Sequence, residues 1–507
     1  MKVLTRILIA IPAILLQFWW MILLAVMWDD IAEIVDFLVA VYSFVFVLYI
    51  VTKRDEGSYK VLWLILILAF PLPGTFLYSC YGNQRSAKPI RKKLDRSEGE
   101  IKVYKDVNSE DIFEKVAADN SHLAAILKRT QRETGFPLVR NENAKYFSLG
   151  EEMHKVMLEK LKQAKKFIFA EYFIVENGMM WNSMVEIMEQ KVQEGVEVYF
   201  MYDDIGSIST YSNRNVKDLK KKGVKCVSFN PMTAIHGTLN YRDHRKMLVI
   251  DGEIAFSGGV NLADEYINKK KKYGHWKDIG FYVTGAAAQV YSQMFVEFWN
   301  AFSKPQQQLE IKKYFPPVPK NISDSDDGYV LSYFDSPVRF ETFSNDLYID
   351  LLYQAERTAW FYTPYLMLGD HLLEAFVKAA ERGVDVRIIM PGIPDKKIVY
   401  RMSRGYYRTL MEAGVQIYEY TPGFVHAKGC IIDGNIATVG TVNLDYRSLF
   451  LHFENNSVFF KAKMIEDFKA DFLKTQSKST LRTLADLKTG DIRWFIDGIL
   501  RIFAPLC

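Results

Sequence analysis

The sequence predicts an α/β protein built from two duplicated lobes, each a mixed β-sheet flanked by helices, preceded by N-terminal transmembrane helices. Three observations predict this architecture. The N-terminal region consists of apolar runs, the rest of the chain alternates short β-rich runs with helical periodicity, and one pattern of helix, glycine and strand occurs twice. A chain of 507 residues is long enough for two or three domains, each with its own buried core.

The N-terminal region holds three apolar runs, over residues 7–28, 31–51 and 61–78. Because about 20 helical residues cross the hydrocarbon core of a bilayer, the first two runs are long enough to span it and the third nearly so. A cleaved signal peptide is the competing interpretation of the first run, but no small-residue cleavage site follows it before Asp29. We therefore expect residues 1–82 to form a membrane anchor of two to three helices.

The charges that flank these runs indicate their orientation. Lys2 and Arg6 precede the first run and basic residues follow the second, which favours a cytoplasmic N-terminus with Asp29 outside. We expect a multi-pass protein of the cell membrane whose lobes lie in the cytoplasm. A third full span would instead export the basic stretch from Arg85 to Lys93, unless Pro71 and Pro73 let that run kink or re-enter, so the sequence leaves the side open.

Composition and charge restrict the function classes. A net charge of +4 is small for this length and argues against a nucleic-acid binder held by a large positive field. The cysteines are scattered and form no C-x-x-C pair, which argues against a zinc site and a disulfide framework. Asp203 and Asp204 are expected to cap a strand end rather than to bind a metal. We expect no metal and no cofactor.

The duplication covers most of the chain after the anchor. "AKKFIFAEYFIV" and "AERTAWFYTPYLM" each predict a strand, and each is followed by a helix that stops at a glycine, Gly195 or Gly383, before a buried strand. "KKKGVKCVSF" and "MEAGVQIYEY" repeat the pattern of helix, glycine and strand. We expect a connecting region at 83–150, a first lobe at 151–303, a linker of Pro-rich and polar composition at 304–328 and a second lobe at 329–476.

Each half ends on the same polar motif. After a histidine, both copies have lysine at the second position, aspartate at the seventh, glycine at the fourteenth and asparagine at the seventeenth. The candidate catalytic and phosphate-binding residues of the first copy are His244, Lys246, Asp251 and Asn261, and those of the second are His426, Lys428, Asp433 and Asn443. A single string of this kind is more often accidental than catalytic, whereas its duplication on matched secondary structure favours a function.

Strand geometry explains these spacings. Histidine and lysine two apart share one face of a strand, and the Asp-Gly step that follows predicts a hairpin whose returning strand brings the asparagine beside them. An imidazole, an ammonium and an amide at one point suit a phosphate. Two facing copies could divide the chemistry, since one histidine can attack phosphorus while the other protonates the leaving alcohol. The lysines can neutralise the phosphate oxygens without a metal.

A nucleophilic histidine needs an acceptor that fixes its tautomer. The aspartate of the motif stands at an odd offset, which directs it away from the imidazole, so we expect Asp251 and Asp433 to be mainly structural. Two acidic residues lie downstream in strand-like runs, in "GHWKDIGF" and "LHFENNS". We predict that Asp278 orients His244 and that Glu454 orients His426.

At these residues the sequence resembles the phospholipase D superfamily, whose mark is two H-x-K-x-x-x-x-D motifs. Within it, "LILAFPLPGTFLYSCYGN", "HRKMLVIDGEIAFSGGVNLADEY" and "GTVNLDYRSLFLHFEN" resemble the bacterial cardiolipin synthases. The resemblance covers nearly the whole chain. Gly259 stands where many relatives have serine, so the first half lacks one side-chain hydroxyl that could bind the phosphate. The first apolar run looks like an extra N-terminal helix.

The resemblance implies phospholipase D-like lobes in a bacterial cell membrane. It implies that two phosphatidylglycerol molecules give cardiolipin and glycerol through a phosphohistidine intermediate, with His244 as nucleophile and His426 as acid and base. The expected partners are phosphatidylglycerol and the lipid bilayer, with no nucleic acid, and a homo-oligomer is left open. An exchange of one phosphodiester for another needs no external energy source, in keeping with a sequence that has no Walker-type loop.

The C-terminal segment 477–507 is predicted to be an amphipathic helix. In "DIRWFIDGILRIFAPL" the charged Arg493, Asp497 and Arg501 are four apart, which suits a helix in the lipid interface, and a helix packed on the catalytic core is the alternative. Other functions also stay open. A membrane-tethered nuclease, a phospholipase D that uses water and a phosphatidylserine synthase would share the motifs, whereas a non-enzymatic scaffold would not need both intact.

Overall fold

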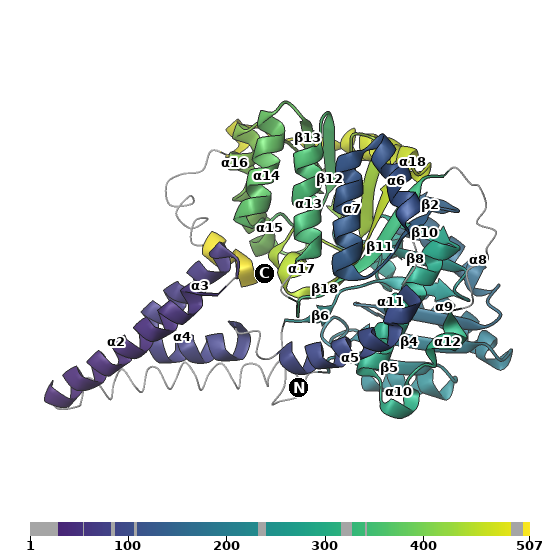
Figure 1. Cartoon of the computed structure of the whole chain (residues 1–507), viewed down its shortest axis with the longest axis horizontal. Helices are drawn as coiled ribbons and strands as arrows, with labels where there is room; N and C mark the ends of the chain where they lie inside the picture. Colours follow the sequence, from purple (N-terminus) through teal and green to yellow (C-terminus); the bar gives the residue numbers. More distant parts are fainter. Residues whose placement is uncertain are drawn as a thin grey trace.

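Two α/β lobes lie against one another, and helices of the N-terminal region project away from them (Figure 1). The structure, a computed structural model, describes residues 29–53, 55–82, 87–105, 109–231, 240–315, 327–339, 342–487 and 500–506. The predicted α/β class with two duplicated lobes is confirmed. The first apolar run, 7–28, lies outside the described residues.

The first lobe is built on a sheet of seven strands, in the order β2-β10-β8-β7-β3-β4-β5 within the described chain. β3, β4 and β5 are parallel, and β7, β8 and β10 are antiparallel. Parallel strands need crossover helices, and helices α9 and α10 supply them. The strands and helices are β2 (Ala144–Phe147), α8 (Gly150–Leu161), β3 (Phe167–Tyr172), α9 (Met179–Gln193), β4 (Glu197–Asp203), α10 (Asn213–Lys221), β5 (Lys225–Phe229), β6 (Arg242–Asp243), β7 (Met247–Ile250), β8 (Ile254–Gly258), the 3₁₀ turn η3 (Asp264–Ile267), β9 (His275–Lys277), β10 (Gly280–Thr284) and α11 (Ala286–Phe302).

The second lobe repeats this topology. The larger sheet contains the order β11-β18-β17-β16-β12-β13-β14, in which each strand has a counterpart in the first sheet. Helices α13 and α14 lie side by side on one face of this sheet, next to α7 (Figure 1). The elements are β11 (Tyr329–Asp335), α13 (Phe343–Gln354), β12 (Thr358–Tyr362), α14 (Asp370–Glu381), β13 (Asp385–Pro391), α15 (Lys397–Arg404), α16 (Tyr407–Glu412), β14 (Gln416–Tyr420), β15 (Gly423–Val425), β16 (Gly429–Ile432), β17 (Ile436–Gly440), α17 (Tyr446–Phe450), β18 (His452–Phe460) and α18 (Met464–Gln476).

The glycines that end the two equivalent helices adopt the conformation that a helix C-terminus favours. Gly195 follows α9 with φ of 89° and Gly383 follows α14 with φ of 91°. A side chain at positive φ is strained, so glycine is preferred at both positions. This local signal is what made the duplication visible in the sequence.

Helix α11 joins the lobes into one body. Nearly all of its residues from Ala287 to Ala301 are buried, and it contacts strands of both sheets, among them β8 and β11. A helix that is apolar on most of its faces must be covered on most of them. One continuous core cluster therefore includes Phe295 and Trp299 of this helix, Phe169 of the first lobe and Phe334 of the second. The two catalytic halves are fixed to one another by this core.

Residues 83–150 do more than connect the anchor to the first lobe. They form α5 (Lys88–Lys105), α6 (Glu110–Asp119), α7 (Ser121–Thr134), β1 (Leu138–Arg140) and β2. β1 pairs with β11 of the second sheet and β2 pairs with β10 of the first. The segment thus gives one strand to each lobe, and the boundary predicted between it and the first lobe does not separate the two structurally.

The predicted linker is partly ordered. Its described part contains the 3₁₀ turn η4 (Pro305–Gln307) and the short helix α12 (Ile311–Tyr314), whereas 316–326 lies outside the described residues. Tyr314 is buried, and its hydroxyl lies 2.9 Å from that of Tyr199. This side chain attaches the start of the linker to the first lobe.

The C-terminal segment begins differently from the predicted helix. β19 (Ser479–Leu481) pairs with β14, so the second sheet continues past residue 476 and the expectation of one helix over 477–507 is wrong at its start. η5 (Leu484–Leu487) follows, and η6 (Ala504–Leu506) lies near the chain end. Most of the amphipathic stretch, 488–499, lies outside the described residues.

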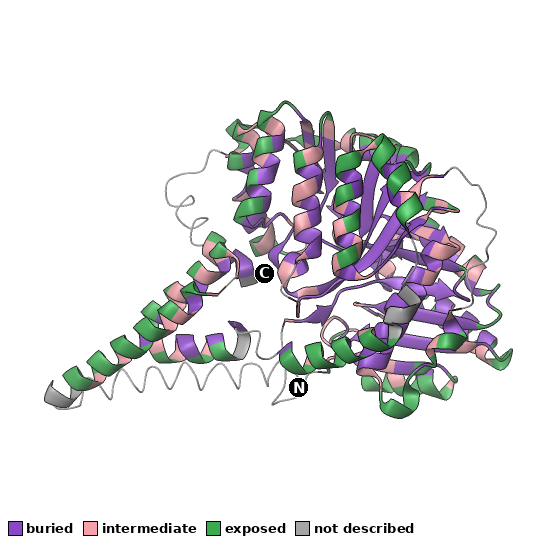
Figure 2. Cartoon of the chain, in the orientation of Figure 1, coloured by how far each residue is buried: buried purple, intermediate pink, exposed green. Residues whose placement is uncertain are grey.

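The N-terminal region contains α2 (Asp29–Val51), α3 (Gly57–Ala69), α4 (Pro71–Leu77) and the π-helical turn η1 (Tyr78–Gly82). Within the described residues, the stretch Glu33–Val51 is long and apolar enough to cross a membrane by length and composition, and most of it is exposed (Figure 2). The third apolar run breaks at Pro71, which occupies the first position of α4. With 13 residues, α3 is too short for a full span.

Helix α3 is attached to the second lobe. Tyr59 stacks on Tyr446 of α17, with ring centroids 5.8 Å apart and an interplanar angle of 12°. Ile50, Trp63 and Leu451 belong to the same buried cluster. The anchor therefore packs on the part of the second lobe that directly follows Asn443.

Candidate active site

The two polar motifs occupy equivalent positions in the two lobes. His244 and Lys246 lie between β6 and β7, and His426 and Lys428 lie between β15 and β16. All four side chains are buried. The predicted hairpins are confirmed, because β7 pairs with β8 and β16 with β17 in antiparallel fashion, and both residues of each Asp-Gly turn have positive φ.

The aspartates of the motifs bind the backbone at the far end of these hairpins. The carboxylate of Asp251 accepts hydrogen bonds from the backbone N–H groups of Lys165, Lys166 and Phe167, at 2.7 to 2.8 Å. Asp433 accepts the equivalent bonds from residues 356–358, at 2.7 to 2.9 Å. Within the described residues, neither carboxylate forms a hydrogen bond with a motif histidine. The arrangement favours the structural role expected for both.

The strands that carry the histidines cross between the lobes. β6 of the first lobe pairs in parallel with β18 of the second, and β15 of the second pairs in parallel with β9 of the first. The backbone N–H of His244 donates to the carbonyl of Phe453 at 2.9 Å, and that of His426 donates to the carbonyl of Lys277 at 2.7 Å. Each histidine is therefore positioned next to an acidic residue of the opposite lobe.

The predicted pairing of histidines and carboxylates is wrong. Nδ1 of His244 lies 2.9 Å from both carboxylate oxygens of Glu454, and Nδ1 of His426 lies 2.6 Å from Oδ2 of Asp278. The prediction places each orienting residue in the same lobe as its histidine. The crossing of β6 and β15 reverses the pairing. The two carboxylates themselves are the residues that the sequence singled out.

Burial and nearby positive charge act on both histidines. The pKa of His244 is lowered well below its usual value by burial and by Lys246, and Lys428 and His426 of the other lobe also contribute. The pKa of His426 is lowered to about 4 by burial and by Lys428, with a contribution from Lys246. Each histidine responds to a charge of the opposite motif, so the two motifs form one cluster. In this cluster both imidazoles are neutral near pH 7.

The lysines share the same buried surroundings. Nζ of Lys246 donates to the backbone carbonyl of His244 at 2.6 Å, and Nζ of Lys428 donates to that of His426. Burial lowers the pKa of Lys246 to about 8 and that of Lys428 to about 7. A buried ammonium gains stability from an anion, because the anion offsets the loss of hydration. The pair is suited to neutralise a phosphate.

The residue between histidine and lysine in the first motif points away from the cluster, as the alternation of side chains along a strand requires. Arg245 forms ion pairs with Glu171 and Asp243, and its guanidinium lies 3.7 Å from the ring centroid of Phe298. In the second motif Ala427 takes this place and is buried. The alternation of side chains along the chain thus directs His244 and Lys246 into the catalytic cluster and Arg245 into the core.

The two asparagines are held differently. Oδ1 of Asn261 accepts from the backbone N–H of Ile174 at 3.0 Å, and its Nδ2 donates to the hydroxyl of Tyr266 at 2.8 Å. Nδ2 of Asn443 donates to Oδ2 of Asp445 at 2.8 Å. An amide nitrogen carries two N–H bonds, so each asparagine keeps a second donor for a ligand. Their predicted phosphate contact stays a prediction.

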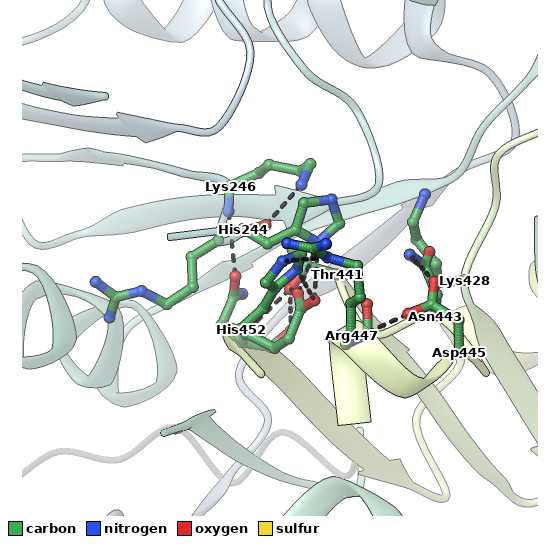
Figure 3. Close-up of polar contacts among 12 residues, drawn as sticks. His244, Lys246, Lys428, Thr441, Asn443, Asp445, Arg447 and His452 are labelled. Carbon is green, nitrogen blue, oxygen red and sulfur yellow. Dashed lines mark hydrogen bonds and ion pairs between the residues drawn. The ribbon is translucent and has the colours of Figure 1, made fainter. Parts of the chain in front are cut away.

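Several residues of the cluster are not predicted by the sequence pattern. Thr441 donates to Oε2 of Glu454 at 2.5 Å, and the ring of His452 lies 5.6 Å from that of His244. Nε of Arg447 donates to Nε2 of His452 at 3.2 Å. Figure 3 shows His452 and Arg447 beside His244, with Asn443 and Asp445 beyond Arg447. His452 stands two residues before Glu454, so the period of a strand could have placed both on one face.

The ligand atoms of His244, His452 and Glu454 lie within 4.8 Å of one another, a spacing that could hold a metal ion. Nδ1 of His244 already binds Glu454, and Lys246 and Arg447 place positive charge beside the group. Asp203, another acidic residue considered for a metal, accepts hydrogen bonds from Arg242 through both of its carboxylate oxygens. The charge of the cluster favours an anion over a cation.

The repeated topology and the paired His-x-Lys segments define a two-lobed phospholipase D-like protein. A family model described as "Cardiolipin synthase, PLD-like domain" matches residues 157–299 and 348–475, more than half of the chain. A second, described as "Phospholipase_D-nuclease N-terminal", matches residues 38–82, which include most of α2 and all of α3 and α4. The chain belongs to the cardiolipin synthase family of phospholipase D-like proteins.

Relatives of known sequence support this assignment over most of the chain. A cardiolipin synthase of Halalkalibacterium halodurans is 34% identical over 444 residues, which cover 85% of each chain. An uncharacterized protein of Streptococcus mutans is 40% identical and covers 91% of this chain and 99% of its own. The phosphatidylserine synthase of Haemophilus influenzae has a similar fold, with a TM-score of 0.54 at 16% identity over 75% of this chain and 97% of its own. The N-terminal match and the exposed apolar helix indicate membrane association.

Proposed function

We propose that the protein is a phosphatidyltransferase that joins two phosphatidylglycerol molecules to give cardiolipin and glycerol. The observation that carries this proposal is the crossed arrangement of the two histidines, each bound through Nδ1 to a carboxylate of the opposite lobe within one lysine-rich cluster. With Nδ1 of each imidazole directed at a carboxylate, Nε2 is left for chemistry.

In the first half of the proposed reaction His244 is the nucleophile. Its neutral imidazole attacks the phosphorus of the donor lipid through Nε2, a P–N bond forms, and the P–O bond to the glycerol head group breaks. The departing oxygen takes a proton from Nε2 of His426, and glycerol leaves. Lys246 and Lys428 neutralise the non-bridging oxygens as negative charge builds up. The assignment of His244 follows the family resemblance.

The proton on His426 is linked to substrate binding. The pKa of His426 is lowered to about 4 by burial and by Lys428, so the imidazole is neutral before the lipid binds. A phosphodiester anion between the lysines offsets their charge and favours the protonated imidazole. Binding of the donor lipid therefore prepares the acid that the leaving glycerol needs.

In the second half the hydroxyl of another phosphatidylglycerol attacks the phosphohistidine. A new P–O bond forms, the P–N bond to His244 breaks, and the proton of the hydroxyl passes to His426. One phosphodiester has replaced another, so the reaction needs no nucleotide and no cofactor. The buried cluster limits access of water, which would otherwise turn the transfer into hydrolysis.

The test uses the purified full-length chain in detergent with EDTA and phosphatidylglycerol labelled in the head group. We expect cardiolipin and free glycerol in equal amounts, and loss of both in His244→Asn and His426→Asn. His122→Asn serves as the matched control, because His122 is exposed on α7, and should act like the unchanged protein. Phosphatidic acid without cardiolipin would show a hydrolase, and loss of activity with EDTA would show a need for a metal.

A further inference from the structure

The second lobe carries a polar group of side chains beside the catalytic cluster that has no equivalent among the described residues of the first lobe. Asp445 is the N-cap of α17, where its Oδ1 accepts from the backbone N–H of Ser448 at 2.8 Å. Its Oδ2 accepts from Nδ2 of Asn443 at 2.8 Å. A carboxylate accepts and does not donate, so it fixes the orientation of the Asn443 amide.

This orientation leaves Oδ1 of Asn443 available. The side chain is 5% exposed, and Oδ1 has no hydrogen-bond partner among the described residues. In the first lobe the equivalent atom of Asn261 accepts from the backbone of Ile174. A buried carbonyl oxygen without a donor is costly, and the O–H group of an alcohol would satisfy it. The second lobe thus has an unengaged acceptor for a hydroxyl, whereas the equivalent oxygen of the first lobe already accepts a backbone hydrogen bond.

Two cationic side chains lie on the same side of the cluster. Arg447 extends from α17 to His452 (Figure 3), and Nζ of Lys396 lies 3.0 Å from the hydroxyl of Tyr365. The chain beside Tyr365 runs along the motif, since the backbone N–H of Met367 donates to the carbonyl of Leu444 at 2.8 Å. Burial raises the pKa of Asp445, and both Arg447 and Lys396 oppose that rise. Both cations therefore act near Asn443.

The proposed reaction involves two phosphodiesters, one on each lipid. Lys246 and Lys428 can neutralise the phosphate that reacts. The accepting lipid brings a second phosphate, joined to its reactive hydroxyl by the three carbons of glycerol. Two phosphate anions separated by only one glycerol unit repel each other, so binding both without added positive charge is unfavourable. An enzyme that uses an anionic lipid as acceptor therefore benefits from a second cationic site one glycerol length from the first.

We propose that Asn443, Arg447 and Lys396 form the binding site for the glycerophosphate head group of the accepting lipid. This inference rests on the proposed function. Oδ1 of Asn443 accepts the hydrogen bond of a glycerol hydroxyl, while Arg447 and Lys396 bind the phosphodiester of the same lipid. The site aligns the other hydroxyl for attack on the phosphohistidine and explains why a second lipid rather than water is used.

The surroundings of Lys396 suit a lipid that arrives from the bilayer. Its side chain is 60% exposed, so the ammonium, which lies 3.4 Å from Oδ2 of Asp395, can be reached from outside. Ile393 and Ile398 on either side of it are exposed apolar residues, which fits contact with the acyl region of the interface. The anchor helix α3 packs on Tyr446, the residue before Arg447. The proposed site thus lies where the anchor attaches to the catalytic lobes.

The test compares two acceptors of the same phosphatidyl-enzyme. Transfer to phosphatidylglycerol is measured as cardiolipin, and transfer to free glycerol, which carries no phosphate, is measured as exchange of labelled glycerol into phosphatidylglycerol. In Lys396→Gln and Arg447→Gln we expect the ratio of cardiolipin synthesis to glycerol exchange to fall by roughly tenfold or more each, as for loss of a charge-assisted hydrogen bond. Lys397→Gln is the matched control, because Lys397 is exposed and adjacent, and should keep the ratio.

A ratio that is unchanged in both variants would overturn the acceptor site. So would an equal loss of synthesis and exchange in Lys396→Gln, since this would place the lysine at the donor phosphate. The exposed position of Lys396 makes misfolding of this variant an inadequate explanation. Failure of the proposed function has a different signature, namely that the unchanged protein forms no cardiolipin and incorporates no labelled glycerol.

Discussion

Oε1 of Glu454 lies 2.9 Å from Nδ1 of His244, although the two residues belong to opposite lobes. A second contact between the lobes joins Asp278 of the first lobe to His426 of the second. Neither lobe can therefore hold its own histidine in the tautomer that leaves Nε2 available. The duplication produced two halves that are both incomplete.

We predict that Glu454→Gln and Asp278→Asn each reduce kcat by roughly 10²-fold or more, because the amide can present N–H instead of a lone pair to Nδ1 of its histidine. Phosphatidyl transfer in detergent measures this loss. The exposed Glu412→Gln is a matched control and should retain full activity. Full activity in both site variants would contradict the orienting role.

The proposed nucleophile can be identified by trapping. A donor lipid with a p-nitrophenol head group needs no acid for its departure, so the first half of the reaction should survive in His426→Gln while the second half is slowed. We expect the phosphatidyl adduct to accumulate on His244, seen by mass spectrometry of peptides kept at neutral pH. Absence of any histidine adduct would refute the assignment. So would an adduct that forms only when His244 has been replaced.

The sequence could predict the parts of the site but not their pairing. The motif positions and both carboxylates follow from duplication and from the period of a strand, which are local properties. The partner of an edge strand is not local: β6 pairs with β18 more than two hundred residues away, and no apolar pattern specifies this choice. Asp278 stands closer in sequence to His244 than Glu454 does, and this proximity favoured the wrong pair.

The fold, like the site, could be predicted where the local sequence determines the structure and not where a distant strand does. Gly195, Gly383 and the two Asp-Gly turns predicted the duplicated helices and hairpins, because these glycines report the local backbone conformation. Short strands such as β1 and β19 could not be predicted, since three residues carry no period and both are added at the two edges of the second sheet by segments outside the duplicated pattern. Arg447 was missed because a five-residue helix offers no pattern of its own.

The lobes also differ at Gly259, whose equivalent in the second lobe is Thr441. A Cβ at Gly259 would lie 2.0 Å from Oδ1 of Asp278, whereas Thr441 donates to the longer side chain of Glu454. We predict that Gly259→Thr displaces Asp278 from His426 and lowers kcat by roughly 10²-fold, comparable with the loss of the orienting group itself. Gly99→Ala, where a Cβ meets nothing within 4 Å, is the control. Unimpaired turnover in Gly259→Thr would contradict this account.

The motif aspartates should affect stability more than turnover. Asp251 accepts three backbone hydrogen bonds, and an asparagine would place an N–H group against the backbone N–H of Lys165. We predict that Asp251→Asn lowers the free energy of unfolding by about 1–3 kcal/mol, with kcat of the folded protein retained. Urea denaturation in detergent measures the first quantity. The exposed Asp467→Asn should leave both unchanged, and a large loss of kcat in folded Asp251→Asn would indicate direct participation.

The pKa values of the two lysines predict how anion binding varies with pH. An ammonium is charged below its pKa, and burial lowers the pKa of Lys428 to about 7 and that of Lys246 to about 8. Sulfate is a tetrahedral anion that does not titrate between pH 6 and 9, so a change in its affinity reports the protein. We expect the inhibition constant of sulfate to rise between pH 7 and 9 by at least about tenfold, because the site loses positive charge as the lysines deprotonate. In Lys428→Met the rise should be smaller and should begin at higher pH, since only Lys246 then titrates. An inhibition constant that stays constant across this range would mean that both lysines keep ordinary pKa values. The conclusion that they lie in one buried cluster of interacting charges would then be wrong.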